Sequence, residues 1–118
     1  MRFTLLMSYS EAAGAALSPE EMADGQAAFD AYAKALDDAD VLIAAEVFTS
    51  VVEAVTISGG QLVDAKDDAD EQLSGIFLID VLDRAEAIEW AKRSPAAEWG
   101  TMVVRPSQLY FDDGSWRG

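Results

Sequence analysis

The alternation of apolar and polar side chains divides the first half of the chain into a strand, a long helix and a second strand. Residues 3–9 alternate with the two-residue period of a half-buried strand. Residues 19–39 carry apolar side chains at helical spacing, and residues 41–48 predict a strand whose centre is apolar on both faces. The helix stripe that we expect to be buried contains Met22, Phe29, Tyr32 and Leu36. Between the first strand and the helix, the Ala/Gly/Ser-rich residues 10–17 predict a loop.

The start of the long helix carries several signals that agree. Ser18 is placed as the N-cap, Pro19 suits the first helical position, and Glu21 completes a capping box with Ser18. Leu17 and Met22 have the spacing of a hydrophobic staple across this cap. We therefore expect the helix to begin at Pro19.

The second half of the chain predicts four more strands and one more helix. The strands are expected at residues 53–58, 61–63, 75–80 and 101–105. Gly59 and Gly60 mark the turn between the first two of them. Asp83 is placed to cap the helix, and Pro95 ends it.

This order of elements predicts an α+β protein with a ferredoxin-like βαββαβ plan, in which one antiparallel sheet carries both helices on one face. Residues 42–45 and 76–79 are apolar without alternation, as in strands that are buried on both faces. We therefore expect a second copy of the chain to cover the other face, sheet against sheet, in a homodimer. Residues 1–106 would form this domain, and residues 107–118 a tail that packs on the barrel or on the partner.

The charge balance limits the partners of the protein. Twenty-two Asp and Glu residues against eight Lys and Arg residues give a formal net charge of −14. Nucleic acids and anionic membrane surfaces are disfavoured, because both are bound through Lys and Arg. No apolar run reaches the ~20 residues of a membrane span, and residues 1–9 predict a strand and not a signal peptide. We expect a cytoplasmic protein whose acidity serves solubility; attraction of a cationic ligand or a basic partner is the alternative.

The chain contains no histidine and no cysteine. These absences exclude disulfides, zinc sites built from His or Cys, and the Ser-His-Asp and Cys-His arrangements of nucleophilic catalysis. There is no glycine-rich phosphate loop, and we expect no cofactor. The acidic residues 64–70 lack the glycine and the glutamate that a calcium loop needs, so we expect a solvated loop and no metal site. Acid–base chemistry would fall to a carboxylate, a tyrosine or a lysine, the lysines being Lys34, Lys66 and Lys92.

Four polar side chains are candidates for a site beside the predicted sheet, namely Tyr9, Glu46, Asp64 and Arg105. In an enzyme, Asp64 or Glu46 would act as the acid–base group. Tyr9 and Arg105 would orient an anionic or phenolic ligand. In the structural alternative, Arg105 pairs with a carboxylate, Tyr9 is an aromatic rim residue and Asp64 belongs to a turn.

Two tryptophans flank the end of the second helix. We expect Trp90 and Trp99 to pack within the protein, as tryptophans beside a helix end commonly do. The alternative is that they form the wall of a ligand site.

Residues 61–106 resemble the YCII-related family, in particular its DGPF branch. The segments that carry the resemblance are Glu71-Gln72-Leu73-Ser74-Gly75, Phe77-Leu78-Ile79-Asp80-Val81, Glu86-Ala87-Ile88-Glu89-Trp90-Ala91, Pro95-Ala96-Ala97, Gly100 and Val104-Arg105-Pro106. In the N-terminal half, Met7, residues 17–22 and the strand that closes on Glu46 fit as well. The resemblance covers nearly the whole chain and implies a dimeric α+β barrel, in agreement with the argument from the uncovered sheet face.

The resemblance implies less about function. The DGPF branch is named for an Asp-Gly-Pro-Phe turn, and this chain has Val63-Asp64-Ala65-Lys66 in that place. The wider family resembles small enzymes with a His-Asp acid–base pair, among them a dehydrochlorinase of chlorinated hydroxyquinols, and a chain without histidine cannot form that pair. The resemblance thus implies a small-molecule-binding protein or a vestigial enzyme. The alternative is a non-enzymatic homodimer that binds a protein, since many relatives are encoded near extracytoplasmic-function sigma factors.

Overall fold

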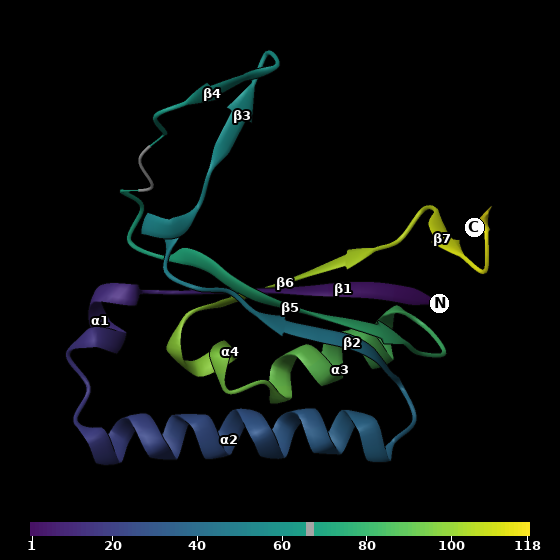
Figure 1. Ribbon diagram of the computed structural model, residues 1–118. Helices are drawn as coiled ribbons and strands as arrows, with labels where there is room; N and C mark the ends of the chain where they lie inside the picture. Colours follow the sequence, from purple (N-terminus) through teal and green to yellow (C-terminus); the bar gives the residue numbers. More distant parts are fainter. Residues whose placement is uncertain (66–67) are drawn as a thin grey trace.

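Four antiparallel strands form the central sheet of the protein, and the helices cover one of its faces (Figure 1). The computed structural model describes residues 1–65 and 68–118. The strands are β1 (Arg2–Tyr9), β2 (Leu42–Val47), β5 (Gln72–Asp80) and β6 (Thr101–Pro106), in the order β2-β5-β1-β6. The helices of the covered face are α2 (Pro19–Asp38), α3 (Arg84–Arg93) and α4 (Ala96–Trp99). This arrangement confirms the predicted α+β class and is consistent with a ferredoxin-like fold.

A short helix, α1 (Glu11–Ala15), stands where the sequence predicts a loop. Ser10 caps this helix, because its hydroxyl accepts a hydrogen bond from the Ala13 N–H at 3.1 Å. The sequence EAAGA offers no apolar stripe, so periodicity cannot reveal the helix. Its formation depends on the cap and on the helix propensity of alanine.

The strands β3 (Thr56–Ser58) and β4 (Gln61–Val63) form a hairpin that projects from the body of the protein (Figure 1). They pair with each other and do not join the central sheet. The chain enters the hairpin through η1 (Val51–Glu53), a 3-10 turn, and β3 begins three residues later than the strand predicted over residues 53–58. Gly59 and Gly60 both adopt positive φ angles, 60° and 77°, which the hairpin turn requires and which glycine adopts without strain.

Tyr32 of α2 lies at the centre of the core between helices and sheet. Its ring packs edge-to-face against Phe77, at 5.1 Å between centroids, and against Trp90, at 6.4 Å. The Tyr32 hydroxyl donates a hydrogen bond to the Trp90 carbonyl oxygen at 2.8 Å, so the buried polar group is satisfied. In the predicted helix stripe Leu36 is also buried, Phe29 is partly buried and Met22 is exposed. The core is completed by Phe3, Leu5, Met7, Ile79, Val81, Ala87, Ala91 and Ala96.

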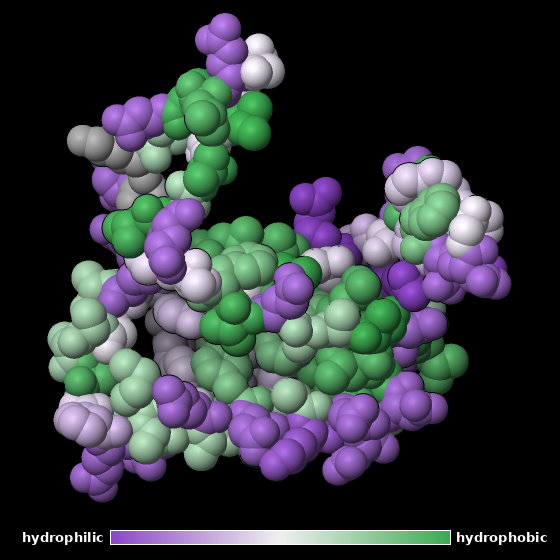
Figure 2. All heavy atoms as spheres, viewed as in Figure 1, coloured by the Kyte–Doolittle hydropathy of each residue, from purple (hydrophilic) through white to green (hydrophobic). Residues whose placement is uncertain are grey.

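The face of the sheet opposite the helices is predominantly apolar. Strand pairing places Glu46, Ile76, Leu6 and Val103 in one row across this face, and Ala44, Leu78, Thr4 and Arg105 in the next. We call these eight residues the open face. Val103 is 45% exposed there, and Ile76 and Leu78 are only half-buried. Figure 2 shows further hydrophobic side chains on the hairpin that rises above this level of the molecule.

The C-terminal residues form a second hairpin, from β7 (Tyr110–Asp112) and β8 (Ser115–Arg117). It projects on the side of the sheet opposite the helices, as the β3–β4 hairpin does, but at the other end of the strands (Figure 1). The Arg2 guanidinium lies 3.9 Å from the centre of the Tyr110 ring. This cation–π contact attaches the hairpin to β1.

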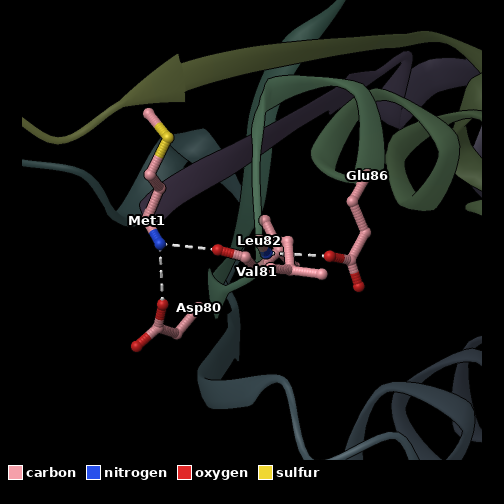
Figure 3. Close-up of polar contacts among 5 residues, drawn as sticks. All are labelled: Met1, Asp80, Val81, Leu82 and Glu86. Carbon is pink, nitrogen blue, oxygen red and sulfur yellow. Dashed lines mark hydrogen bonds and ion pairs between the residues drawn. The ribbon is translucent and has the colours of Figure 1, made fainter.

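At the start of each of the two long helices, side chains accept hydrogen bonds from backbone N–H groups. Ser18 and Glu21 form the predicted capping box of α2, with hydrogen bonds of 3.1 Å to the Ser18 hydroxyl and 3.0 Å to the Glu21 carboxylate. At α3, the Asp83 side chain accepts the Glu86 N–H at 2.9 Å, as predicted, and the Glu86 carboxylate accepts the Leu82 N–H at 2.8 Å (Figure 3). These bonds satisfy backbone N–H groups at the first turn of each helix and so fix where each helix begins.

The first residue of the chain is bound at the end of β5. The Met1 ammonium group donates hydrogen bonds to the Asp80 carboxylate, at 3.1 Å, and to the Val81 carbonyl oxygen (Figure 3). The Val81 N–H returns a hydrogen bond to the Met1 carbonyl oxygen at 2.9 Å. These bonds extend the pairing of β1 with β5 to the first residue.

Two glycines allow backbone segments to lie in direct contact. A Cβ at Gly100 would overlap the Ser8 carbonyl oxygen, and a Cβ at Gly75 would overlap the Glu46 carbonyl oxygen and the Met7 side chain. Only glycine fits at these two positions without movement of the neighbouring backbone.

Candidate functional site

A cavity of about 900 Å³ lies at the end of the sheet from which the β3–β4 hairpin projects. It is bounded by α1, the first half of α2, the ends of β1 and β2, the start of β5 and the last residue of α4. The lining is predominantly apolar, and its large apolar side chains are Leu17, Met22, Phe29, Phe48, Leu73 and Trp99. Segments from five parts of the sequence therefore meet around one hollow.

Glu11 holds one wall of this cavity in place. Its carboxylate accepts the backbone N–H of Val51, at 3.0 Å from one oxygen and 3.3 Å from the other. Its own N–H donates to the side-chain oxygen of Gln72 at 2.9 Å, and the Gln72 side-chain amide donates to the Ala69 carbonyl at 2.6 Å. The short helix α1 is thus bound both to the turn after β2 and to the start of β5.

Trp99 forms an aromatic part of the cavity wall. Its ring packs edge-to-face on Phe29, with centroids 5.4 Å apart, and remains 49% exposed. Gly25 in α2 makes room for this ring, because a Cβ at Gly25 would approach the ring edge to 3.2 Å. Large aromatic surface is therefore accessible to a ligand in the cavity.

The charged residues of the lining are all acidic. Glu11, Glu21 and Asp24 line the cavity, and its lining includes no Lys or Arg of residues 1–65 and 68–118. The capping box lowers the pKa of Glu21, first through its hydrogen bond with the Ser18 backbone and then through the Ser18 hydroxyl. Asp24 forms no hydrogen bond or ion pair with any of the described residues. Among the described lining residues, a ligand in this cavity would face carboxylates and no Lys or Arg side chain.

The family of the protein follows from a match across almost its full length. The YCII-related domain matches residues 1–107. The chain belongs to the YCII-related family. No curated protein matches this YCII-related chain. Its place in the DGPF branch and the loss of the DGPF turn stay predictions, and Lys66, which lies in the segment compared with that turn, is outside the described residues.

The four site residues that the sequence predicts lie on different elements of this YCII-related domain. Tyr9, at the end of β1, lines the cavity. Glu46 is exposed on the edge strand β2, and Arg105 is exposed on the opposite edge strand β6. Asp64 follows β4 and lines a smaller hollow of about 390 Å³ within the projecting hairpin. Within one chain the structure therefore brings only Tyr9 to the cavity, and the acid–base roles of Glu46 and Asp64 stay predictions.

Two residues important for the cavity were not singled out from the sequence. Glu11 lies in the segment expected to be a loop, and Phe48 lies just beyond β2. A Ser10 cap before an alanine-rich segment is the signal that could have revealed α1. Of the two tryptophans, Trp90 packs in the core as expected. Trp99 packs on Phe29 as expected and also lines the cavity, and its role as the wall of a ligand site stays a prediction.

Two other kinds of site receive no support from the residues that can be assessed. Among residues 1–65 and 68–118, the side chains of Asp and Glu form no cluster of three that could hold a metal ion. No helix in the same ranges has both the length and the apolar character needed to cross a membrane.

Proposed function

We propose that this YCII-related protein binds a small molecule in the cavity beside α1. The observation that carries the proposal is the apolar hollow of about 900 Å³ with an exposed indole on its wall. Sites for small ligands have volumes of ~300–1,000 Å³ and are lined mainly by apolar and aromatic side chains with a few polar groups. The hydroxyl of Tyr9 and the carboxylate of Asp24 are among the polar groups of the lining that such a ligand could meet.

The charge of the lining favours a ligand that is neutral or cationic. Burying an anion beside Glu11, Glu21 and Asp24 would cost Coulomb energy, and no Lys or Arg of the lining could compensate. An apolar amine would keep its hydrocarbon part against Trp99 and its ammonium group near Asp24. This proposal differs from the anionic or phenolic ligand expected from Arg105, because Arg105 pairs with Thr4, away from the end of β1 that lines the cavity.

The carboxylates of the cavity favour a binding role over acid–base catalysis. The Glu11 and Glu21 carboxylates both accept backbone hydrogen bonds, so neither is free to exchange a proton with a ligand without losing a structural contact. Glu46 and Asp64 are exposed to solvent. If either acts as an acid–base group, the chain is an enzyme without the family's His-Asp pair.

A pair of probes that differ only in charge tests the proposal. 3-Phenylpropylamine and 3-phenylpropionate would be titrated into ¹⁵N-labelled protein, with amide shifts followed in two-dimensional NMR spectra. We expect the amine to bind with a dissociation constant of about 1 mM and to shift amides around the cavity. The absence of shifts with both probes would contradict the binding proposal, and tighter binding of the carboxylate would contradict the charge argument.

A matched pair of variants separates a local charge effect from the net charge of −14. Asp24→Asn removes one charge from the lining, and Asp38→Asn removes one charge from the far end of the same helix. We expect Asp24→Asn to weaken amine binding about threefold to tenfold. Asp38→Asn is expected to leave the affinity unchanged within about twofold.

We also propose that the protein is a homodimer that pairs through the open face. The supporting observation is that Ile76, Leu78 and Val103 are apolar and incompletely buried on a sheet whose other face is covered by helices. Sedimentation equilibrium at micromolar concentration would test this, with a dimeric mass expected and a monomeric mass contradicting it. A regulatory association with a sigma factor rests on the family resemblance alone, and co-purification of such a protein would be its test.

A further inference from the structure

The β3–β4 hairpin and the residue before it carry large apolar side chains that are mostly exposed to solvent. We call residues 51–63, which comprise η1 and this hairpin, the arm. On the arm, Ile57 and Leu62 stand opposite each other in the strand pairing and are 68% and 74% exposed, and Val55 is 73% exposed. A two-stranded hairpin without further packing is at best marginally stable. The arm therefore needs a surface on which these side chains can pack.

The C-terminal hairpin has the same property at the other end of the sheet. Phe111 and Trp116 stand opposite each other in its pairing, with ring centroids 5.4 Å apart. They are 58% and 68% exposed, and Leu109 beside them is 57% exposed. Exposed aromatic rings in this number mark contact surfaces more often than free surface.

We propose that in the homodimer each arm packs against the C-terminal hairpin of the other copy. The inference rests on the proposed homodimer. Both hairpins rise on the side of the sheet opposite the helices and at opposite ends of the strands (Figure 1). A two-fold axis that exchanges the strand ends would bring the arm of one copy beside the C-terminal hairpin of its partner, twice per dimer.

The distribution of charged residues favours contact between the arm of one copy and the C-terminal hairpin of the other over contact between the two arms. Glu46, Glu53 and Asp64 lie on or next to the arm, and the described residues of that segment include no Lys or Arg. At the other end of the sheet, Arg2 and Arg105 form no ion pair with a carboxylate of the described residues; the C-terminal hairpin there also carries Asp112 and Asp113, and Asp113 pairs with Arg117. When opposite strand ends of the two copies meet, the acidic residues of one arm approach Arg2 and Arg105 of the partner. When like ends meet, the acidic residues of the two arms would face and repel each other.

A spin label on the arm tests the contact directly, because the chain has no cysteine of its own. A nitroxide on the Leu62→Cys variant, in unlabelled protein, would be mixed with ¹⁵N-labelled wild-type protein. Signal loss in the labelled copies can then arise only from a partner molecule. With the spin-labelled protein in large excess, so that most ¹⁵N-labelled copies have a spin-labelled partner, we expect the amides of residues 109–117 to lose at least half of their intensity. Loss at residues 55–63 instead, or no loss at all, would overturn the proposal.

Two controls make the outcomes distinct. A nitroxide on the Ala31→Cys variant, on the solvent side of α2, should leave residues 109–117 unchanged. Leu62→Asp should raise the dissociation constant of the dimer at least about tenfold, whereas Leu82→Asp, at a position 86% exposed in the loop before α3, should not. A monomeric wild type would overturn both the homodimer and the arm contact. A dimeric wild type with a Leu62→Asp variant of unchanged affinity would overturn the arm contact alone.

Discussion

The carboxylate of Glu11 accepts the backbone N–H of Val51 at 3.0 Å, which joins the helix after β1 to the turn after β2. These residues are 40 positions apart in the sequence. The bond closes one wall of the cavity and fixes the base of the arm at the same time. The candidate ligand site and the candidate dimer contact therefore share one structural support.

Removal of this support should loosen α1. Glu11→Ala leaves the Val51 N–H without its acceptor, and we expect the free energy of unfolding to fall by about 1–2 kcal/mol, as for other hydrogen bonds to charged groups. Urea unfolding measures the change. Asp37→Ala, which removes an exposed carboxylate near the end of α2, is the matched control and should change stability by less than about 0.5 kcal/mol. An equal effect of the two substitutions would contradict the role of Glu11.

Gly100 should be the least tolerant position of the sheet edge. A Cβ there overlaps the Ser8 carbonyl oxygen, so Gly100→Ala must displace β1 or β6, and we expect a loss of about 3 kcal/mol or more. Gly14→Ala provides the control, because a Cβ at Gly14 meets no atom within 4 Å and alanine favours the helix α1. Thermal unfolding of both variants should show a large decrease for the first and none for the second. A Gly100→Ala protein as stable as the wild type would show that the contact relaxes freely.

The buried hydroxyl of Tyr32 should make the protein sensitive to alkali. Burial raises its pKa from the ordinary 10.0 to about 12, although the Arg93 charge opposes the shift. The unfolded chain thus loses this proton at lower pH than the folded chain. The contribution of Tyr32 to stability is complete below pH 10 and is lost as the pH rises from 10 through about 12.

The variant Tyr32→Phe isolates this effect. It removes the hydrogen bond to the Trp90 carbonyl and should cost about 1 kcal/mol at neutral pH. Its stability difference from the wild type should shrink between pH 10 and 12 in urea unfolding. Leu36→Val, a core change on the same helix without a titrating group, should keep a constant difference. A constant difference for Tyr32→Phe would contradict the raised pKa.

The sequence predicts those parts of the fold that depend on neighbouring residues. Ser18, Pro19 and Glu21 define the start of α2 within four positions, and the structure confirms the capping box. The apolar runs around residues 42–45 and 76–79 likewise predict two paired strands of the sheet. These signals are local in sequence, so one chain suffices to read them.

The cavity could not be predicted in the same way, because it depends on contacts between distant segments. Glu11 becomes a wall residue only through its bonds to Val51 and Gln72, and Trp99 only through its packing on Phe29. The four predicted site residues lie in or just after predicted strands. The strand order nevertheless places Glu46 and Arg105 on opposite edges of the sheet. Sequence position alone does not determine which edge a strand occupies.

The indole signals of the three tryptophans test the central claim, that the cavity beside α1 is a ligand site. Trp99 lines the cavity, Trp90 is buried in the core and Trp116 lies on the C-terminal hairpin, so the last two serve as internal references. 3-Phenylpropylamine would be added to ¹⁵N-labelled protein while the indole N–H resonances are followed. Binding in the cavity predicts a saturable shift of the Trp99 indole with Trp90 and Trp116 unmoved. A shift of Trp116 alone, or no shift of Trp99 at saturating amine, would contradict the account.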